Sequence, residues 1–427
     1  MGIFGLFGNK KNEAEAEAER EEALKNQKES ALEELKNAHK DLSWPVIGRI
    51  NPVNIKDAGS AVMEETVSPE RKDEVGNLIY EEDLSTDTLK FLSGQELLFL
   101  LTAMEAFHKK SPLPEFEKNH RKVYNEVLGR IRDAEYLYVL YDKNTGFPFI
   151  DHGYASVYFE EEICQKAVEL FGKQFRKLAC NKVRVEDREH PDPRKMGFFD
   201  FLYNVGIENL IIDNGAYRAR FKRNEIVAAP GDWNNNARAG SPMNPALNFA
   251  MLDFLTELKW PVNYEKRNEV LKAKEIKMVS LIRNSQFIVP MQHEGPAEVM
   301  EDGRIKLNKD SKFRLLVMKT ADGKQFLPVY TDGFEFSKLP QFKEWNAGVF
   351  KFHDLLNFVQ DKEGIRINPE GQGLVMTKDR MMQADAAVQQ AGAVKAKASA
   401  ANPGKSADNA VQQALNQAMK QMRDDKK

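Results

Sequence analysis

The chain has 427 residues and a formal net charge of −3, from 62 basic and 65 acidic side chains. Its length accommodates about three domains of ordinary size. The near balance of charge produces no long-range field that would attract nucleic acid, so we expect no nucleic-acid partner. Two cysteines, Cys164 and Cys180, are too few for a disulfide framework. They are typical of a reducing compartment and predict a cytoplasmic protein.

The first eleven residues combine a short apolar stretch with Lys10 and Lys11. Residues 2–8 are too few to cross a bilayer, which needs about 20 residues in a helix. No positive region precedes them, as it would in a signal peptide. Two interpretations stay open: a disordered terminus, or a short anchor in which residues 2–11 make a weak peripheral contact with a membrane.

The next segments predict a charged helix followed by a linker. Residues 12–42 are rich in Ala, Glu and Lys, which favour a solvated helix, and their leucines are too sparse for a coiled coil. We therefore assign residues 1–42 to an apolar N-terminus and this helix. No helical or strand periodicity persists through residues 43–92, because it is interrupted by Pro45, Pro52 and Pro69. This pattern predicts a linker or extended arm.

A first domain is predicted over residues 93–227. Ser93 and Glu96 form a capping-box pattern at the start of a helix that ends near Lys110, and a second helix follows to about Ile131. Aromatic and β-branched runs separated by turn residues then predict strands, with helices between them. The predicted strands are 136–141, 147–150, 156–159, 182–185, 209–212 and 217–221, and the predicted helices are 160–175 and 198–205.

After a linker at residues 228–243, a second domain over residues 244–381 repeats this pattern. Ile131–Tyr136 reappears as Ile282–Phe287 with size or polarity kept at each position. Further matches pair Pro148 with Pro328, Gly153 with Gly333, and Asn214 with Asn368. Long-period similarity of this kind indicates repeated structural units. The predicted fold class is α+β: two tandem copies of a mixed β-sheet domain with flanking helices, plus helical or disordered termini.

The C-terminal segment has a different composition. Residues 382–427 are dominated by Ala, Gln and Lys and contain no aromatic residue. Such a segment buries too little apolar surface to offset the entropy of ordering. We expect a disordered tail.

The second copy also contains an ordered series of short motifs. A strand ends in Pro328-Val329-Tyr330-Thr331, a short helix follows, and Asn368-Pro369 turns into a last strand. This order resembles the SseB N-terminal domain family, named for an enhanced-serine-sensitivity phenotype. The resemblance reaches the first copy chiefly through the repeat. There residues 149–152 are matched to 329–332, and Asn214 to Asn368, so a shared surface would be degenerate in the first copy. The resemblance implies no enzymatic reaction.

Two groups of residues are candidates for binding. Thr331, Asp332 and Asn368 lie where strands end, and polar loops at one end of a sheet often bind ligands. The alternative is that they only form turns, because Asn and Pro favour turns on their own. Arg218, Arg220 and Lys222 alternate with apolar residues, which predicts one basic strand face. That face either pairs with an acidic partner or protects a solvated sheet edge.

Catalytic and metal-binding patterns are absent from the sequence. It has no Cys-x-x-Cys, His-Glu-x-x-His, Gly-x-Ser-x-Gly or phosphate-binding loop. Cys164 lies among apolar helix residues and is interpreted as a buried thiol. We expect no catalytic residue, no metal and no cofactor. The sequence thus predicts a non-catalytic binding or regulatory protein with a protein partner. The alternatives are an enzyme with a site between the two copies, or a membrane-tethered scaffold.

Overall fold

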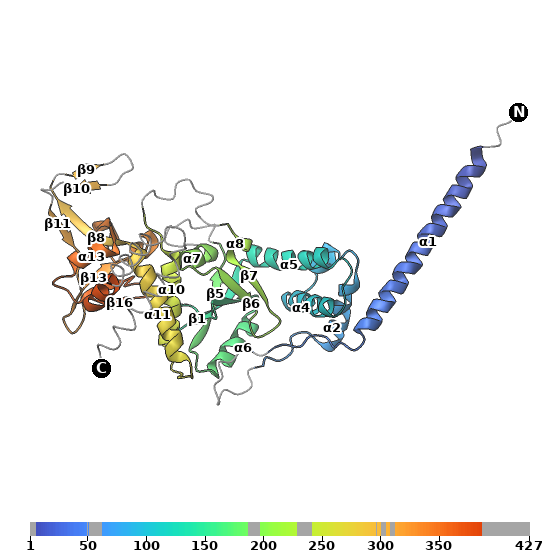
Figure 1. Ribbon diagram of the computed structural model, residues 1–427, viewed down its shortest axis with the longest axis horizontal. Coiled ribbons are helices and arrows are strands. Elements are labelled where there is room, and N and C mark those ends of the chain that lie inside the picture. The colour runs from blue at the N-terminus through green and yellow to red at the C-terminus, as the bar shows by residue number, and fades with distance from the viewer. Residues whose placement is uncertain are drawn as a thin grey trace, which may run out of the picture.

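The computed structural model describes residues 6–48, 50, 62–186, 197–228, 241–295, 297–299, 305–307 and 312–386. It has the expected α+β class, with helices packed around mixed sheets. Figure 1 shows helix α1 (Leu6–His39) projecting from one end, the first sheet near the middle and the second half at the other end. The predicted membrane contact at residues 2–11 lies outside the residues whose side chains are described. Among the described residues, no helix is long and apolar enough to cross a bilayer.

The C-terminal end of α1 is docked, although most of the helix is exposed. His39 is 2% exposed, and its ring packs edge-on against Phe107 at 5.2 Å. The next segment continues this contact, because Trp44 stacks on Phe107 at 4.8 Å and donates a hydrogen bond to Asp73. Aromatic contacts therefore fix the base of α1 to the first domain.

The prediction of a linker at residues 43–92 is wrong for residues 62–92. These residues form α2 (Pro69–Gly76), the 3₁₀ helix η1 (Asn77–Tyr80) and α3 (Thr86–Lys90). Ser68 caps α2, and Pro69 occupies the first turn, where a missing N–H costs nothing. Val75, Ile79 and Leu89 are buried in the first core. Pro69 therefore marks the start of a helix, not part of an extended arm.

Two helices precede the first sheet, as predicted. Helix α4 (Gly94–Lys110) begins with the expected capping box of Ser93 and Glu96, and α5 (Phe116–Asp133) follows. Helix α4 is buried on most sides, whereas α5 buries one stripe that includes Val123, Val127 and Ile131. The two helices close one side of the first core.

The first sheet is mixed, with strand order β2-β1-β4-β6-β7, while β5 pairs with β1 and β3 pairs with β4. The one parallel pair is β4 with β6. Its strands are β1 (Tyr136–Asp142), β2 (Phe147–Pro148), β3 (Ile150–Asp151), β4 (Tyr154–Tyr158), β5 (Leu178–Arg184), β6 (Asn209–Ile212) and β7 (Ala219–Lys222). Helices α6 (Glu161–Gly172), α7 (Phe198–Asn204) and α8 (Arg223–Ile226) connect or follow them. Strand β5 begins at Leu178, four residues before the predicted start.

The second half begins with α10 (Pro245–Leu258) and α11 (Arg267–Asn284). Strand β8 (Gln286–Glu294) pairs with β11 (Lys312–Leu315) and β14 (Asn346–Lys351), and Ile288 bridges it to Tyr330 after β13 (Gln325–Val329). Strand β13 runs parallel to β15 (Gly364–Ile367). The remaining elements are β9 (Ala297–Val299), β10 (Ile305–Leu307), β12 (Met318–Lys319), β16 (Leu374–Thr377), α12 (Gly333–Ser337), η2 (Phe342–Glu344) and α13 (Phe352–Phe358).

The two halves contact each other through α10. Leu252 on this helix belongs to the first core, whereas its neighbour Met251 belongs to the second. Gly206, with φ of +74°, brings its backbone so close to Pro245 that an added Cβ would lie 2.0 Å from the Pro245 carbonyl oxygen. Only glycine fits at this approach.

The prediction of a disordered tail from residue 382 is wrong for residues 382–386. Residues 378–386 are helical, and Ala384 is buried in the second core. Asp385 also accepts a hydrogen bond from His353 at 3.1 Å if the ring nitrogen is protonated. A short helical extension therefore closes the second domain, and the rest of the predicted tail lies outside the described residues.

Candidate functional sites

Strand β7 carries the predicted basic face at an edge of the first sheet. Phe221 is 2% exposed, whereas the side chains of Arg220 and Lys222 face solvent. Arg218 is half-buried and donates to Asn214 Oδ1 at 3.0 Å. Among the described strands, β7 pairs with β6 alone. The structure thus brings Arg220 and Lys222 together on an edge strand but uses Arg218 locally.

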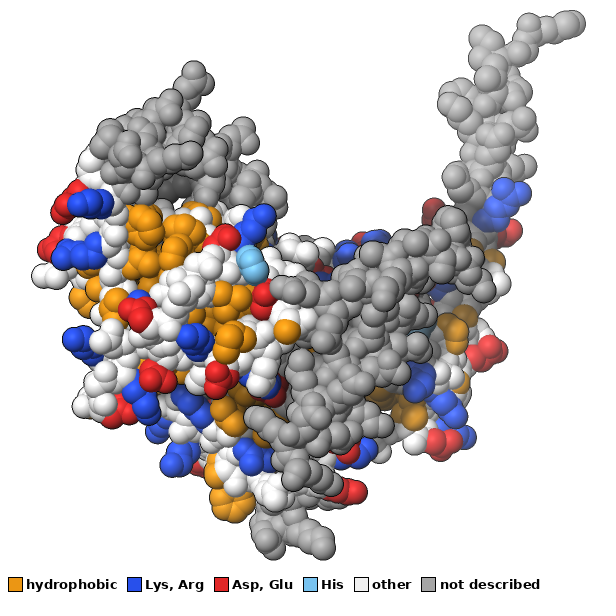
Figure 2. All heavy atoms as spheres, turned by 60° about the vertical axis from the view of Figure 1, so that its left-hand side comes forward, with side chains coloured by type: hydrophobic (Ala, Val, Ile, Leu, Met, Phe, Trp, Pro, Cys, Tyr) orange, Lys and Arg blue, Asp and Glu red, His pale blue; other side chains and the backbone are white. Residues whose placement is uncertain are grey.

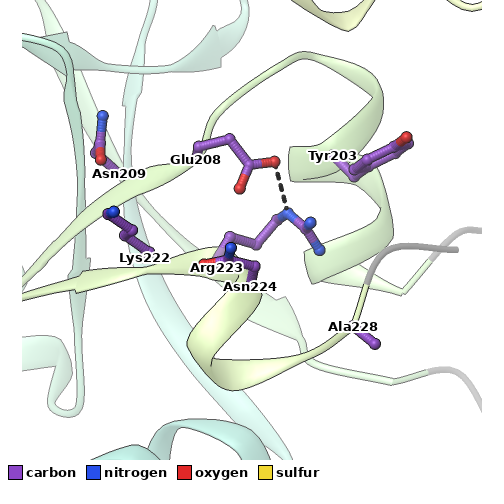
Figure 3. A pocket seen from close by; sticks show the side chains of 7 residues that line it. All are labelled: Tyr203, Glu208, Asn209, Lys222, Arg223, Asn224 and Ala228. Atoms are coloured by element: carbon purple, nitrogen blue, oxygen red, sulfur yellow. Dashed lines mark hydrogen bonds and ion pairs between the residues drawn. The ribbon is translucent and has the colours of Figure 1, made fainter. Parts of the chain in front are cut away.

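A cavity of about 700 Å³ opens beside the end of β7 (Figure 3). Lys222 and Asn209 lie on the paired strands at one side, and Tyr203 comes from α7 on the other. Arg223, only 1% exposed, pairs with Glu208 Oε1 at 3.1 Å and lies over the Tyr203 ring at 5.0 Å. Because Glu208 neutralises Arg223, the exposed Lys222 supplies the free positive charge here.

No sequence pattern indicated a role for Arg223 and Glu208. The alternation of basic and apolar residues stops at Lys222, because Arg223 begins α8 and turns inward. Glu208 reaches it through the pairing of β6 with β7, which joins residues 209 and 222. Because this strand register depends on the tertiary structure, the local sequence does not predict it.

Thr331, Asp332 and Asn368 lie in a buried hydrogen-bond network, and their exposed fractions are 0%, 3% and 0%. Asn368 Oδ1 accepts from the Thr331 backbone N–H at 2.9 Å, and its Nδ2 donates to Thr331 Oγ1 at 2.9 Å. Asp332 caps α12 by accepting from the Glu335 N–H at 2.8 Å. We expected these side chains in open loops, and the structure instead encloses them.

Asn248 on α10 extends this network toward the first half. Its Nδ2 lies 3.0 Å from Asp332 Oδ2 and 2.8 Å from the Asn204 carbonyl oxygen, and donates to both. Its Oδ1 accepts from Asn368 Nδ2 at 3.2 Å. The candidate residues therefore connect the end of the second sheet to α7 of the first half. The sequence offered no pattern that would pair Asn248 with them.

The first sheet has a comparable buried group around Asp213. Its Oδ1 accepts from the Phe159 backbone N–H at 3.1 Å, and its Oδ2 accepts from Gln95 Nε2 at 2.7 Å. Asp213 is fully buried, and burial raises its pKa to about 7. Desolvation disfavours the charged carboxylate more than these two hydrogen bonds favour it.

The remaining reactive side chains do not assemble a catalytic site among the described residues. Both cysteines are free, and burial raises the pKa of the Cys164 thiol, which opposes thiolate formation. No three His, Cys, Asp or Glu side chains of the described part gather in a way that would hold a metal ion. The face in Figure 2 interleaves acidic and basic side chains with hydrophobic ones, without a large area of one sign.

The fold and these sites define a protein with mixed-sheet domains whose polar residues cluster where the parallel strands end. Comparison with known families places one part of it: residues 267–383 match the SseB protein N-terminal domain. The match runs from the start of α11 to just beyond β16, so it covers most of the second half and none of the first. No curated protein and no solved structure matches the chain significantly.

Proposed function

We propose that the protein is a non-catalytic binding or regulatory protein of the cytoplasm, built from two related SseB-like domains, which binds an acidic protein partner at the basic edge of its first sheet. The family match supports the domain type in the second half. The relation between the halves and the partner are supported by separate observations.

The two sheets have corresponding strand orders, which supports two copies of one domain. The first contains β5-β1-β4-β6-β7, and the second contains β14-β8-β13-β15-β16 once the Ile288 to Tyr330 bridge is included. In each, only the third and fourth strands of the series run parallel. Sharing one unusual parallel pair at the same place favours duplication over chance similarity.

A matching hydrogen bond supports one alignment of the proposed copies. Phe159 N–H donates to Asp213 Oδ1, as Thr331 N–H donates to Asn368 Oδ1. Asp213 and Asn368 also share left-handed backbones, with φ of 53° and 48°. These features support equating Asp213 with Asn368, in place of the sequence-based matches of Asn214 to Asn368 and of residues 149–152 to 329–332.

The open, basic edge of β7 is the observation that supports binding of an acidic partner. Arg220 and Lys222 project from one face of a strand that has no strand neighbour on its outer side among the described residues. The adjoining cavity offers Asn209, Asn224 and Lys222 as polar contacts. An extended acidic segment fits such an edge, since opposite charges guide encounter and exposed strand edges accept peptides.

The test measures binding of a fluorescein-labelled decaglutamate peptide to the full chain by anisotropy. We expect the Arg220→Glu/Lys222→Glu variant to bind at least about tenfold more weakly, because attraction becomes repulsion at two adjacent positions. The matched control is Lys319→Glu/Lys343→Glu, which makes the same charge change at two exposed positions of the second half. Equal weakening by both pairs, or no binding by the parent at low salt, would contradict the proposal.

A further inference from the structure

A second cleft, of about 870 Å³, lies between the two halves. The turn between β3 and β4 and the residue Arg176 form its first-half wall. The end of α10, the loop to α11 and the start of α11 form the other. Its volume is typical of small-molecule sites, which are commonly found between domains.

Arg176 is held rigidly at this cleft. Its guanidinium carbon lies 3.6 Å from the centre of the Trp260 ring and 5.2 Å from that of Phe149, so aromatic rings contact it from both halves. Trp260 is itself fixed, because its indole N–H donates to the Gln174 carbonyl oxygen at 2.9 Å. Two aromatic neighbours restrict the plane of the guanidinium and leave its edge to make hydrogen bonds.

The N–H donors at the edge of the Arg176 guanidinium make almost no hydrogen bonds with the described residues. Its one hydrogen bond within the described residues is a long one, 3.4 Å from Nη1 to the Thr256 carbonyl oxygen. No carboxylate of the described part lies within ion-pair distance of it. A guanidinium offers five N–H donors, and a half-buried one without a bonded carboxylate is unusual. Thr256 Oγ1, also at the cleft, is buried without a hydrogen-bond partner in the described structure.

The other charges at the cleft already have partners or lie at its rim. Lys274 pairs with Asp253 Oδ1 at 2.9 Å and with Glu257 Oε2 at 3.4 Å, and Tyr264 donates to Glu257 Oε1 at 3.0 Å. His152 pairs with Asp151 at 3.0 Å, which raises the pKa of the histidine. Glu265 and Lys266 are exposed and of opposite sign. Among the cations of the described lining, Arg176 is thus the half-buried one without a bonded carboxylate, and a single guanidinium favours a ligand with a single negative charge.

We propose that this cleft binds a small organic monocarboxylate with an apolar body. The planar carboxylate bonds the free edge of Arg176, as a guanidinium fork matches two carboxylate oxygens. The apolar body lies along Trp260, Val262 and Val270, which line the same cleft. This site does not depend on the acidic partner at β7.

The test titrates the full chain by calorimetry with phenylacetate and, separately, with its neutral analogue phenylacetamide. We expect saturable binding of phenylacetate and at least about tenfold weaker binding of the amide, because only the acid forms charge-assisted hydrogen bonds. Arg176→Gln should weaken phenylacetate by a similar factor, and Arg176→Lys by less. Arg314→Gln, which removes an exposed arginine that lies over Trp345 in the second half, is the matched control and should leave binding unchanged.

Three results would overturn the proposal: no saturable binding of phenylacetate, equal binding of acid and amide, or unchanged affinity in both Arg176 variants. If Arg176→Gln fails to fold, as circular dichroism would show, the comparison of acid with amide on the parent chain decides the question alone.

Discussion

Asp213 and Asn368 have similar backbone conformations but different side chains. Each residue has a left-handed backbone at the end of a parallel strand, and each side-chain Oδ1 accepts one backbone N–H. Asp and Asn tolerate this conformation better than most residues because their short polar side chains bond locally. Unlike the amide, the carboxyl can ionise.

The first residue-scale prediction concerns the pH dependence of Asp213. Its pKa of about 7 in the folded chain exceeds the value near 4 of an unfolded chain. Between these values the folded state binds more protons, so the free energy of unfolding falls as the pH rises from about 4 to about 7. Asp213→Asn removes this titration. We expect the loss of stability between pH 5 and pH 8 to shrink by on the order of 2 kcal/mol.

Urea unfolding of parent and variant at both pH values measures this difference. A substitution that lowers stability equally at pH 5 and pH 8 would show that Asp213 does not carry the titration. The hydrogen bond from Gln95 is the main local loss in the variant, and it costs about 1 kcal/mol at either pH.

At the scale of secondary structure, local sequence signals predicted most elements. The capping box at Ser93, the helical periods and the strand chemistry located α4, α5 and most strands, because these signals act within a few residues. They failed for residues 62–92, where short helices depend on packing against α4. They also could not show that Thr331 and Asn368 are enclosed, since α10 covers them from far away in the sequence.

Gly76, at the end of α2, allows the segment after α1 to pack. A Cβ at this position would lie 2.6 Å from the Trp44 ring. We therefore expect Gly76→Ala to displace Trp44 and to destabilise the chain by about 1 to 3 kcal/mol, as overpacking does. Thermal unfolding and tryptophan fluorescence measure the two effects.

The matched control is Gly129→Ala in the interior of α5. An added Cβ there meets only Arg132 Nη2, at 3.9 Å. Alanine is the better helix former by about 1 kcal/mol, so this variant should be neutral or more stable. Similar losses from both substitutions would contradict a specific role of Gly76.

For the whole molecule, α10 is the element that joins the two cores. The family match begins after this helix, yet Leu252 fills the first core and Met251 the second. Both side chains are fully buried. Adjacent residues on one helix thus contribute to two domains.

This arrangement predicts different effects for two adjacent substitutions. Leu252→Ala should weaken the first domain and Met251→Ala the second, each by about 2 to 5 kcal/mol, because a buried cavity is left. Native-state amide exchange should accelerate mainly in β4 and β6 for the first variant and in β13 and β15 for the second. Identical exchange patterns in both variants would mean that the two cores unfold as one.

The length of helix α1 sets both the distance of its tip from the first domain and the orientation of that tip. Its described contacts with the first domain run from Lys28, which pairs with Glu82, to His39. Each helical residue before Lys28 therefore adds about 1.5 Å of reach and turns the tip by about 100°. Deleting seven residues would shorten the reach by about 10 Å and return the tip to nearly the same orientation. Deleting five would instead turn it by roughly 140°. A deletion in α1 therefore changes both the position of the tip and its orientation about the helix axis.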